Sequence, residues 1–155
     1  MTFPEHTADS SPPAAQPEFT QPRLILFVFL GGALGTLARE SVGFALAANG
    51  GIPWAVLIVN LVGAFLLGFL LTALGSRVPE TPTRRDWRVL AGTGLLGGFT
   101  TYSALATDTA LLIESQPFVG ISYAVGSVIA GLTLAAVGAR AGALIFPPPA
   151  AGAKA

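Results

Sequence analysis

The chain has 155 residues, of which 52% are hydrophobic and 10% are charged, and its formal net charge at pH 7 is zero. In soluble domains about a quarter of the residues are charged, so this composition indicates a protein that lies in a lipid bilayer. The zero net charge argues against a nucleic-acid partner. Because the sequence has no cysteine, disulfides, thiolate metal sites and cysteine nucleophiles are excluded.

The two ends of the chain have the composition of disordered tails. Residues 1–22 contain five prolines and no lysine or arginine, so they have neither the apolar content of a core nor the basic leader of a secretory signal. The single histidine, His6, falls in this tail, which argues against a histidine-based zinc or acid–base site. Residues 147–155, PPPAAGAKA, form the second tail. We therefore predict one domain over residues 23–146.

Four segments of this domain are predicted to span the membrane as helices. A bilayer core about 30 Å thick needs about 20 apolar residues in helical form. The segments that meet this requirement are residues 24–48, 54–74, 89–113 and 118–145. Arg39 and Glu40 lie in the second half of the first segment, and Asp108 lies near the end of the third.

The many glycines favour helices that pack closely within a membrane. The chain has 19 glycines, and small residues spaced four apart, such as Gly31 and Gly35, let two helix backbones approach each other. Tyr123 and Ser127 are also four apart and therefore share one face of the fourth span. Because four thin helices leave little interior, we expect a sizeable pathway to need a second subunit.

Two polar residues inside the spans have both a structural and a functional interpretation. Asn60 in the second span could form an interhelical hydrogen bond, or its amide could offer an N–H donor to a pore, and the sequence leaves both open. Arg39 could extend its head group toward the nearer membrane surface. An ionisable residue within a span is by default a functional candidate, so we favour a water-filled vestibule in which Arg39 attracts anions.

The stretch GGFTTYS, residues 97–103, predicts a break in the third span. Two glycines followed by β-branched threonines weaken a helix, and a broken helix frees carbonyl and N–H groups at membrane depth. Such groups are tolerated only where protein or a cavity satisfies them. Carbonyl oxygens are hard ligands that suit a cation such as Na+, whereas hydroxyls and aromatic ring edges suit an anion. We therefore predict a break that could hold a structural cation, with an anion path beside it.

Taken together, these segments resemble the bacterial fluoride channel family, known as Fluc or CrcB. The resemblance rests on GGALGTLARE in the first span, IVNLVGAFLLG in the second, GGFTTYSAL in the third, and Tyr123 with Ser127 in the fourth. It implies an all-α membrane protein of four transmembrane helices with a break in the third, which assembles as an antiparallel dimer of the dual-topology type. It also implies narrow fluoride pores and one structural Na+ ion at the dimer centre, which is not transported.

The resemblance also implies roles for individual residues. The backbone oxygens of Gly97 and Thr100 are expected to hold the Na+ ion, and Arg39 is expected to lie in the vestibule. The expected ion pathway comprises Asn60, Tyr102, Ser103, Tyr123 and Ser127. These roles come from the family's pattern, placed on the matching positions of this chain.

The chain departs from the family's usual Thr-Thr-Phe-Ser-Thr-Phe pattern at three positions. Tyr102 replaces the first phenylalanine, keeps an aromatic ring edge and adds a hydroxyl. Ala104 replaces the intervening threonine, and Leu105 replaces the second phenylalanine. Leucine has no quadrupole, so we expect one of the two aromatic contacts per subunit to be missing.

The function that this resemblance implies is passive export of fluoride from the cytoplasm, which lowers its toxicity. We expect no enzymatic activity, because no set of nucleophile, base and orienting residue is visible. One alternative is a small proton-coupled multidrug exporter, for which Glu40 is the only suitable carboxylate and Arg39 would oppose cation binding. Another is a poorly conducting partner subunit of a heterodimeric fluoride channel, which the leucine at position 105 favours.

The distribution of basic residues predicts the orientation of the chain in the cell membrane. Four spans place both tails and the link between the second and third spans on one side. That side carries Arg23, Arg77, Arg84, Arg85, Arg88, Arg140 and Lys154. Basic residues in short links stay cytoplasmic, so we predict that both termini are inside. The antiparallel partner would then be either an inverted copy of this chain or a related chain of opposite topology.

Overall fold

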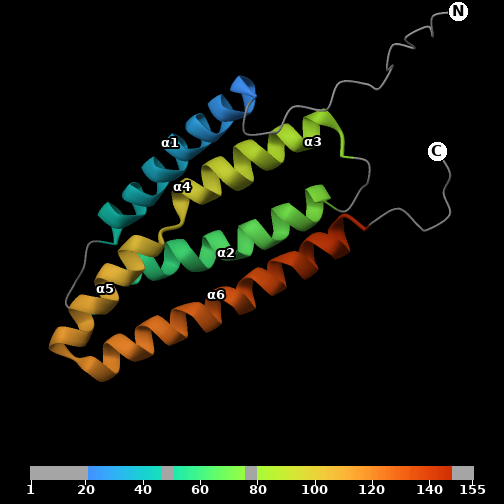
Figure 1. The fold of residues 1–155 in the computed structure, drawn as a ribbon. Helices are drawn as coiled ribbons and strands as arrows, with labels where there is room; N and C mark the ends of the chain where they lie inside the picture. Colours follow the sequence, from blue (N-terminus) through green and yellow to red (C-terminus); the bar gives the residue numbers. More distant parts are fainter. Residues whose placement is uncertain (1–20, 47–50, 76–79, 148–155) are drawn as a thin grey trace, which may run out of the picture.

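The computed structural model describes residues 21–46, 51–75 and 80–147. The chain runs through α1 (Pro22–Ala45), α2 (Trp54–Gly75), α3 (Pro82–Trp87), the π-helix η2 (Arg88–Leu96), α4 (Gly97–Phe99), α5 (Tyr102–Ser115) and α6 (Pro117–Ile145) (Figure 1). Four helical segments of the described residues are long and apolar enough to cross a membrane, and the third comprises α3, η2, α4 and α5. The prediction of four such helices with a break in the third is confirmed.

The helix bounds differ most from the predicted spans at the start of the third span. The helix begins at Pro82, whereas the sequence predicted a span from Val89. Thr81 caps this start, because its side-chain oxygen accepts a hydrogen bond from the Arg84 N–H at 3.4 Å, and proline is well suited to the first helical position. Most of both predicted tails, residues 1–20 and 148–155, lies outside the described residues.

The helices pack as two groups that the third span connects. In the first group α1 packs along η2 and α4, and in the second α2 packs along α6. The third span leaves the first group at the end of α4, and α5 then packs against α6 (Figure 1). The break in the third span is therefore the point at which the chain passes from one group to the other.

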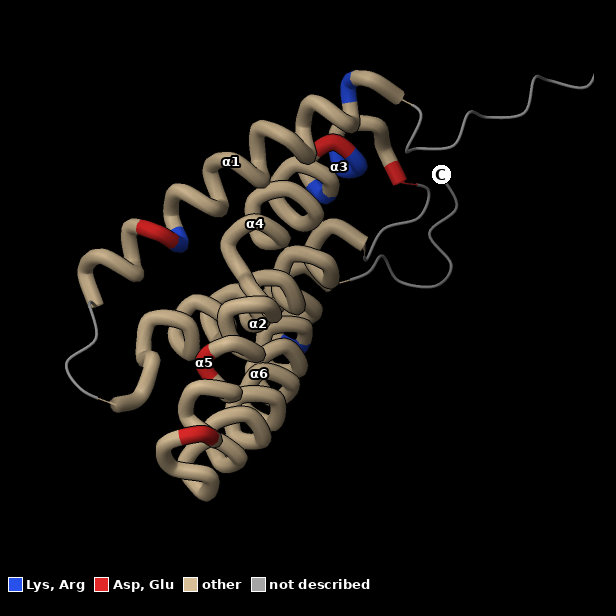
Figure 2. The backbone as a smooth tube through the Cα atoms, turned by 60° about the vertical axis from the view of Figure 1, so that its left-hand side comes forward, with Lys and Arg blue, Asp and Glu red and all other residues tan. Residues whose placement is uncertain are grey.

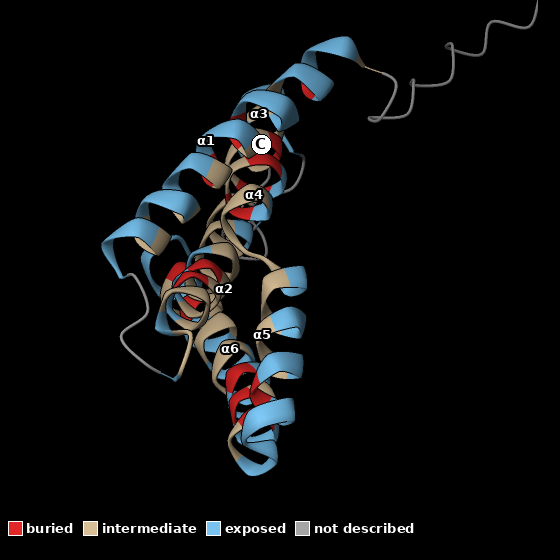
Figure 3. Ribbon diagram, turned by 90° about the vertical axis from the view of Figure 1, so that its left-hand side faces the viewer, coloured by how far each residue is buried: buried red, intermediate tan, exposed pale blue. Residues whose placement is uncertain are grey.

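Among the described residues of a single copy, few large side chains are buried. The buried apolar residues are Leu24, Val59, Val89, Leu96, Leu112 and Tyr123. By contrast Phe29, Phe44 and Phe118 are 69%, 84% and 83% exposed, and the outer faces of the helices are largely exposed (Figure 3). Such extensive apolar exposure is unusual for a soluble monomer but is expected where lipid or another subunit covers the helices.

Two glycines let the neighbouring helices approach the break closely. A Cβ atom on Gly98 would lie 2.9 Å from the Cα atom of Gly32 in α1, which is too close for carbon atoms. A Cβ atom on Gly63, which is buried in α2, would overlap the side chain of Thr100. Glycine at these positions therefore allows α1 and α2 to hold the broken segment between them.

Candidate ion site at the break in the third span

The break consists of two extended residues between two helices. α4 ends at Phe99, after which Thr100 has φ −78° and ψ 154° and Thr101 has φ −147° and ψ 118°. The helix resumes at Tyr102. Extended residues interrupt the regular pattern of hydrogen bonds from each N–H to the carbonyl four residues earlier. The backbone groups at this point therefore need other partners.

The amide of Asn60 supplies two of these partners. Its Nδ2 atom donates to the Thr101 carbonyl oxygen at 2.9 Å, and its Oδ1 atom accepts from the Thr101 N–H at 2.8 Å. The interhelical interpretation of Asn60 therefore holds in this structure, with α2 pairing to the extended backbone. An amide nitrogen carries two N–H groups, so this pairing leaves a second donor for another acceptor. A place for Asn60 in the ion pathway stays a prediction.

The same pairings deprive two carbonyl groups of their usual partners. In a continuous helix the Thr101 N–H would donate to the Gly97 carbonyl, but here it donates to Asn60. The Ala104 N–H would donate to the Thr100 carbonyl, but here it donates to the Thr101 Oγ1 atom at 3.2 Å. Gly97 and Thr100 thus each lose the helical partner of their carbonyl oxygen. These are the two oxygens for which the sequence predicts a role in holding Na+.

The side chain of Thr100 is engaged within its own helix. Its Oγ1 atom donates to the Leu96 carbonyl at 2.9 Å, and its N–H donates to the same oxygen at 3.0 Å. The hydroxyl proton is therefore used locally, as is common for threonine in membrane helices. This arrangement is compatible with a role for the Thr100 backbone oxygen, rather than the hydroxyl, as a ligand.

Arg39 reaches the break from α1. Its Nη1 atom donates to the Gly98 carbonyl at 3.1 Å, and its Nε atom donates to the Glu40 carboxylate at 3.2 Å. Arg39 and Glu40 line a cavity of about 200 Å³, together with Val56, Thr101 and Ala104. A guanidinium has five N–H groups, so Arg39 retains donors beyond these two bonds. The cavity therefore combines a cation with the extended backbone of the break.

Tyr102 and Ser103 lie on the outer side of α5. The Tyr102 side chain is 81% exposed, and it lines a cavity of about 340 Å³ with Leu105 and with Val128 of α6. The Ser103 hydroxyl lies 3.2 Å from the Thr101 hydroxyl, within hydrogen-bonding distance. Two of the three positions at which the chain departs from the family pattern, 102 and 105, thus line the same cavity.

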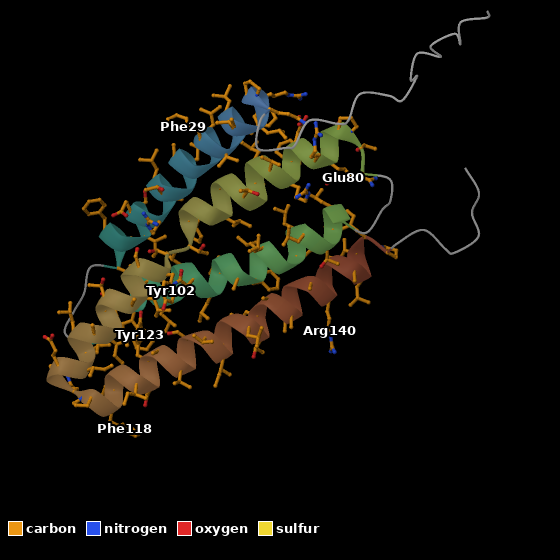
Figure 4. All side chains as sticks on the ribbon, viewed as in Figure 1. Phe29, Glu80, Tyr102, Phe118, Tyr123 and Arg140 are labelled. Carbon is orange, nitrogen blue, oxygen red and sulfur yellow. The ribbon has the colours of Figure 1, made fainter. Side chains whose placement is uncertain are left out.

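Tyr123 and Ser127 lie between α6 and α2, and both are buried. The Ser127 hydroxyl donates to the Tyr123 carbonyl at 2.6 Å, and the Tyr123 hydroxyl donates to the Pro53 carbonyl at 3.4 Å. Both residues line a mostly apolar cavity of about 370 Å³. Figure 4 labels Tyr123 on α6 and Tyr102 on α5. Within one copy, Tyr102 therefore lines a different cavity from Tyr123 and Ser127.

The structure also draws attention to Asp108, to which the sequence interpretation assigned no role. Its Oδ2 atom is buried without a hydrogen-bond partner among the described residues, as is the Oγ1 atom of Thr109. Asp108 lines a cavity of about 280 Å³ with Pro53 and Ser115. Asp108 is the one charged residue of the predicted span 89–113, and this was the signal that could have singled it out.

Comparison with known proteins identifies the family. The family model described as CrcB-like protein, Camphor Resistance (CrcB), matches residues 26–139. The protein named Fluoride-specific ion channel FluC 2 of Leifsonia xyli subsp. xyli is 46% identical over 129 residues, which are 77% of this chain and 89% of that protein. Fluoride-specific ion channel FluC 1 of Cutibacterium acnes is 47% identical over 117 residues, covering 74% of this chain and 82% of that protein. Fluoride-specific ion channel FluC of Deinococcus radiodurans is 42% identical over 125 residues, which are 77% of this chain and 95% of that protein.

The match to the family model includes the second and third spans with the break, and most of the first and fourth spans. The relatives are named as ion channels, so the family is one of transport proteins and not of enzymes. The four apolar helices accordingly make the chain a multi-pass membrane protein. The chain belongs to the CrcB family of fluoride-specific ion channels.

Proposed function

We propose that the chain forms a passive channel that exports fluoride from the cytoplasm and contains a structural Na+ ion. The proposal rests on two hydrogen bonds at the break: the Thr101 N–H donates to Asn60 and the Ala104 N–H donates to the Thr101 hydroxyl oxygen. The carbonyl oxygens of Gly97 and Thr100 are therefore without their helical partners. The names of the relatives support fluoride as the transported ion.

The donor set at the break suits a hard monovalent cation. The two carbonyl oxygens are neutral ligands of the kind that binds Na+ where a membrane helix is unwound. Gly97 is exposed in a single copy, so its carbonyl can contribute to a site shared with a second subunit. A Na+ ion held there would supply a fixed positive charge beside the anion path. The role of Gly97 and Thr100 is to present oxygens that no N–H of their own helix occupies.

The remaining polar groups are suited to guiding an anion. Fluoride holds its water tightly, so a pore must replace that water with donors and yet release the ion. Arg39 would concentrate anions in its cavity, because a cation attracts them electrostatically. The second N–H of Asn60 and the hydroxyls of Tyr102, Ser103, Tyr123 and Ser127 would replace the water along the path.

The direction of transport follows from the chemistry of fluoride. Hydrogen fluoride is a weak acid that crosses membranes in its neutral form and dissociates in the more alkaline cytoplasm. The negative membrane potential then drives the trapped anion outward, at about 2.3 kcal/mol per 100 mV. A passive pathway is therefore sufficient for export.

A second, antiparallel subunit would complete the pathway. Tyr102 and Leu105 line an exposed cavity on α5 and α6, whereas Tyr123 and Ser127 line another between α2 and α6. Pairing two copies could bring the exposed groups of one against the cavity of the other. The multidrug-exporter alternative has less support, because Glu40, its only candidate carboxylate, is paired with Arg39 at 3.2 Å.

Fluoride efflux from liposomes that contain only this chain tests the proposal. We expect fluoride release that is driven by a membrane potential, excludes chloride and declines when Na+ is replaced by an organic cation on both sides. Efflux that does not change on Na+ removal would contradict the Na+ site but leave the channel in place. Proton-coupled uptake of an organic cation, without fluoride release, would contradict the channel itself.

A further inference from the structure

We propose that the hydroxyl of Thr109 on α5 is a further hydrogen-bond donor of the ion pathway, at a position to which the sequence interpretation gave no role. The proposal rests on the proposed fluoride channel and adds one residue to it, beyond Tyr102 on the same helix. Three features of Thr109 support it: an unpartnered buried hydroxyl, the cavity that the residue lines, and its place on α5.

The hydroxyl of Thr109 lacks the local hydrogen bond that serine and threonine usually make in membrane helices. Such side chains commonly donate to the carbonyl four residues earlier. Thr133 does so to Ile129 at 2.8 Å, and Ser127 does so to Tyr123 at 2.6 Å. The Thr109 Oγ1 atom is buried and has no hydrogen-bond partner among the described residues. A buried hydroxyl without a partner is unfavourable, so its O–H is available to a ligand.

The cavity that Thr109 lines is otherwise almost entirely apolar. It has a volume of about 340 Å³, and Tyr102 is the other residue that lines it with a polar side-chain atom. The remaining six lining residues are alanines, a leucine, an isoleucine and a valine. A hydrogen bond is stronger in apolar surroundings than in water. A hydroxyl at this place therefore offers more to an ion that has lost its water than the same group would at the surface.

Thr109 continues a line of side chains that starts at the break. Tyr102, Leu105 and Thr109 are separated by three and four positions, so they share one face of α5. From Tyr102 to Thr109 the helix advances by two turns, or about 10.5 Å. Leu105, which has no donor, lies between them. Thr109 therefore places a donor beyond Leu105, on the way from the break to the end of the third span.

Among the described residues, no charged side chain lines this cavity. The helix α5 carries no lysine or arginine, and its two carboxylates, Asp108 and Glu114, do not line the cavity (Figure 2). Asp108 instead lines the separate cavity with Pro53 and Ser115. A carboxylate would repel an anion, whereas neutral hydroxyl donors can replace part of its water and still release it. The lining is therefore suited to a small anion.

The variant Thr109→Val removes the hydroxyl and keeps the shape of the side chain. In liposomes that contain only this chain, we expect it to lower fluoride efflux about tenfold, which is the change in rate that follows from losing one hydrogen bond to a charged ligand. Its thermal unfolding in detergent should occur at the same or a higher temperature, because the variant removes a buried hydroxyl that has no partner. Thr109→Ser keeps the donor and should retain most of the efflux.

The matched control is Thr133→Val, because the Thr133 hydroxyl is exposed on α6 and already donates to the Ile129 carbonyl. It should leave efflux unchanged. Wild-type efflux in Thr109→Val, or an equal loss in the Thr133→Val control, would overturn the assignment. A lower unfolding temperature of Thr109→Val would also overturn it, because the hydroxyl would then support the fold. Absence of fluoride release from the wild type would instead contradict the channel on which the assignment rests.

Discussion

The side-chain amide of Asn60 pairs with both backbone groups of Thr101, at 2.8 and 2.9 Å, across 41 positions of sequence. Asn60 of α2 thereby supplies partners for the N–H and the carbonyl of Thr101, which the extended backbone would otherwise leave without hydrogen bonds. The pairing also occupies the N–H that a continuous helix would direct to Gly97. Asn60 is therefore a positioning residue for the break, whether or not it also contacts the ion.

Replacing Asn60 tests this positioning role. Asn60→Leu should destabilise the protein by about 1–3 kcal/mol, because it leaves both polar groups of Thr101 without partners at membrane depth. It should also reduce the Na+ dependence of fluoride efflux, because the Thr101 N–H becomes available to Gly97. Thermal unfolding in detergent and efflux with and without Na+ are the measurements.

Asn60→Asp serves as the matched variant, because an ionised aspartate can accept from the Thr101 N–H but cannot donate to its carbonyl. It should lie between the wild type and Asn60→Leu in stability. If Asn60→Leu matches the wild type in both measurements, the amide does not support the break.

Substitutions of Thr100 separate its backbone from its hydroxyl. Thr100→Ser should be mild, because serine keeps the hydroxyl donor to Leu96 and leaves the backbone unchanged. Thr100→Pro should abolish efflux, because proline removes the N–H that donates to Leu96 at 3.0 Å and disfavours the helical conformation of the preceding residue. Measuring fluoride efflux from each variant as a function of Na+ concentration checks both predictions. A Thr100→Ser variant that no longer responds to Na+ would show that the side chain matters more than the backbone oxygen.

The cavity shared by Tyr102 and Leu105 predicts opposite effects of two substitutions. Leu105→Phe should raise fluoride efflux severalfold if this cavity faces the ion, because it adds an aromatic ring edge of partial positive charge. Tyr102→Ile should lower efflux, because it removes the existing ring. Efflux rates of the two variants, normalised to reconstituted protein, provide the test. Unchanged rates in both variants would place this cavity away from the ion.

The pair of Arg39 and Glu40 predicts an electrostatic effect on anion entry. Glu40→Gln should increase efflux at low fluoride concentration, because it removes a negative charge 3.2 Å from the guanidinium. The Glu40 side chain is 59% exposed, so the increase should be modest and should decline at high ionic strength. Arg39→Gln should lower efflux at low fluoride concentration, because it removes the positive charge that attracts the anion. Equal efflux in Glu40→Gln and wild type at low salt would indicate that anions do not enter through this cavity.

The bias of basic residues predicts a single orientation for the chain, with both termini in the cytoplasm. Reporter fusions at the C-terminus, one active inside and one active outside the cell, should give a signal from the inside reporter alone. A chain with one orientation would need a related chain of opposite topology as its antiparallel partner. Fluoride efflux from cells that express only this chain, or equal signals from the two reporters, would argue for a homodimer instead.

The sequence by itself determined the features that depend on local composition. Long apolar stretches predict membrane spans because of the thickness of the bilayer, and the helices α1, α2 and α6 lie within a few residues of the predicted spans. The glycines and threonines of residues 97–103 predict the break because they weaken a helix wherever they occur, and Thr100 and Thr101 are extended. The helix α3 was missed because its signal, a threonine before a proline, is short and lies in a polar link.

Only the tertiary structure decided which groups meet. The partner of Asn60 is 41 positions away and the partner of Arg23, Asp86, is 63 positions away, so neither pair leaves a trace in local composition. From the sequence, the Asn60 side chain could either form an interhelical hydrogen bond or offer an N–H donor to a pore. The packing of α2 against the break pairs it with Thr101. The packing of the helices likewise places Tyr102 of α5 in one cavity and Tyr123 of α6 in another, which spacing along the sequence does not reveal.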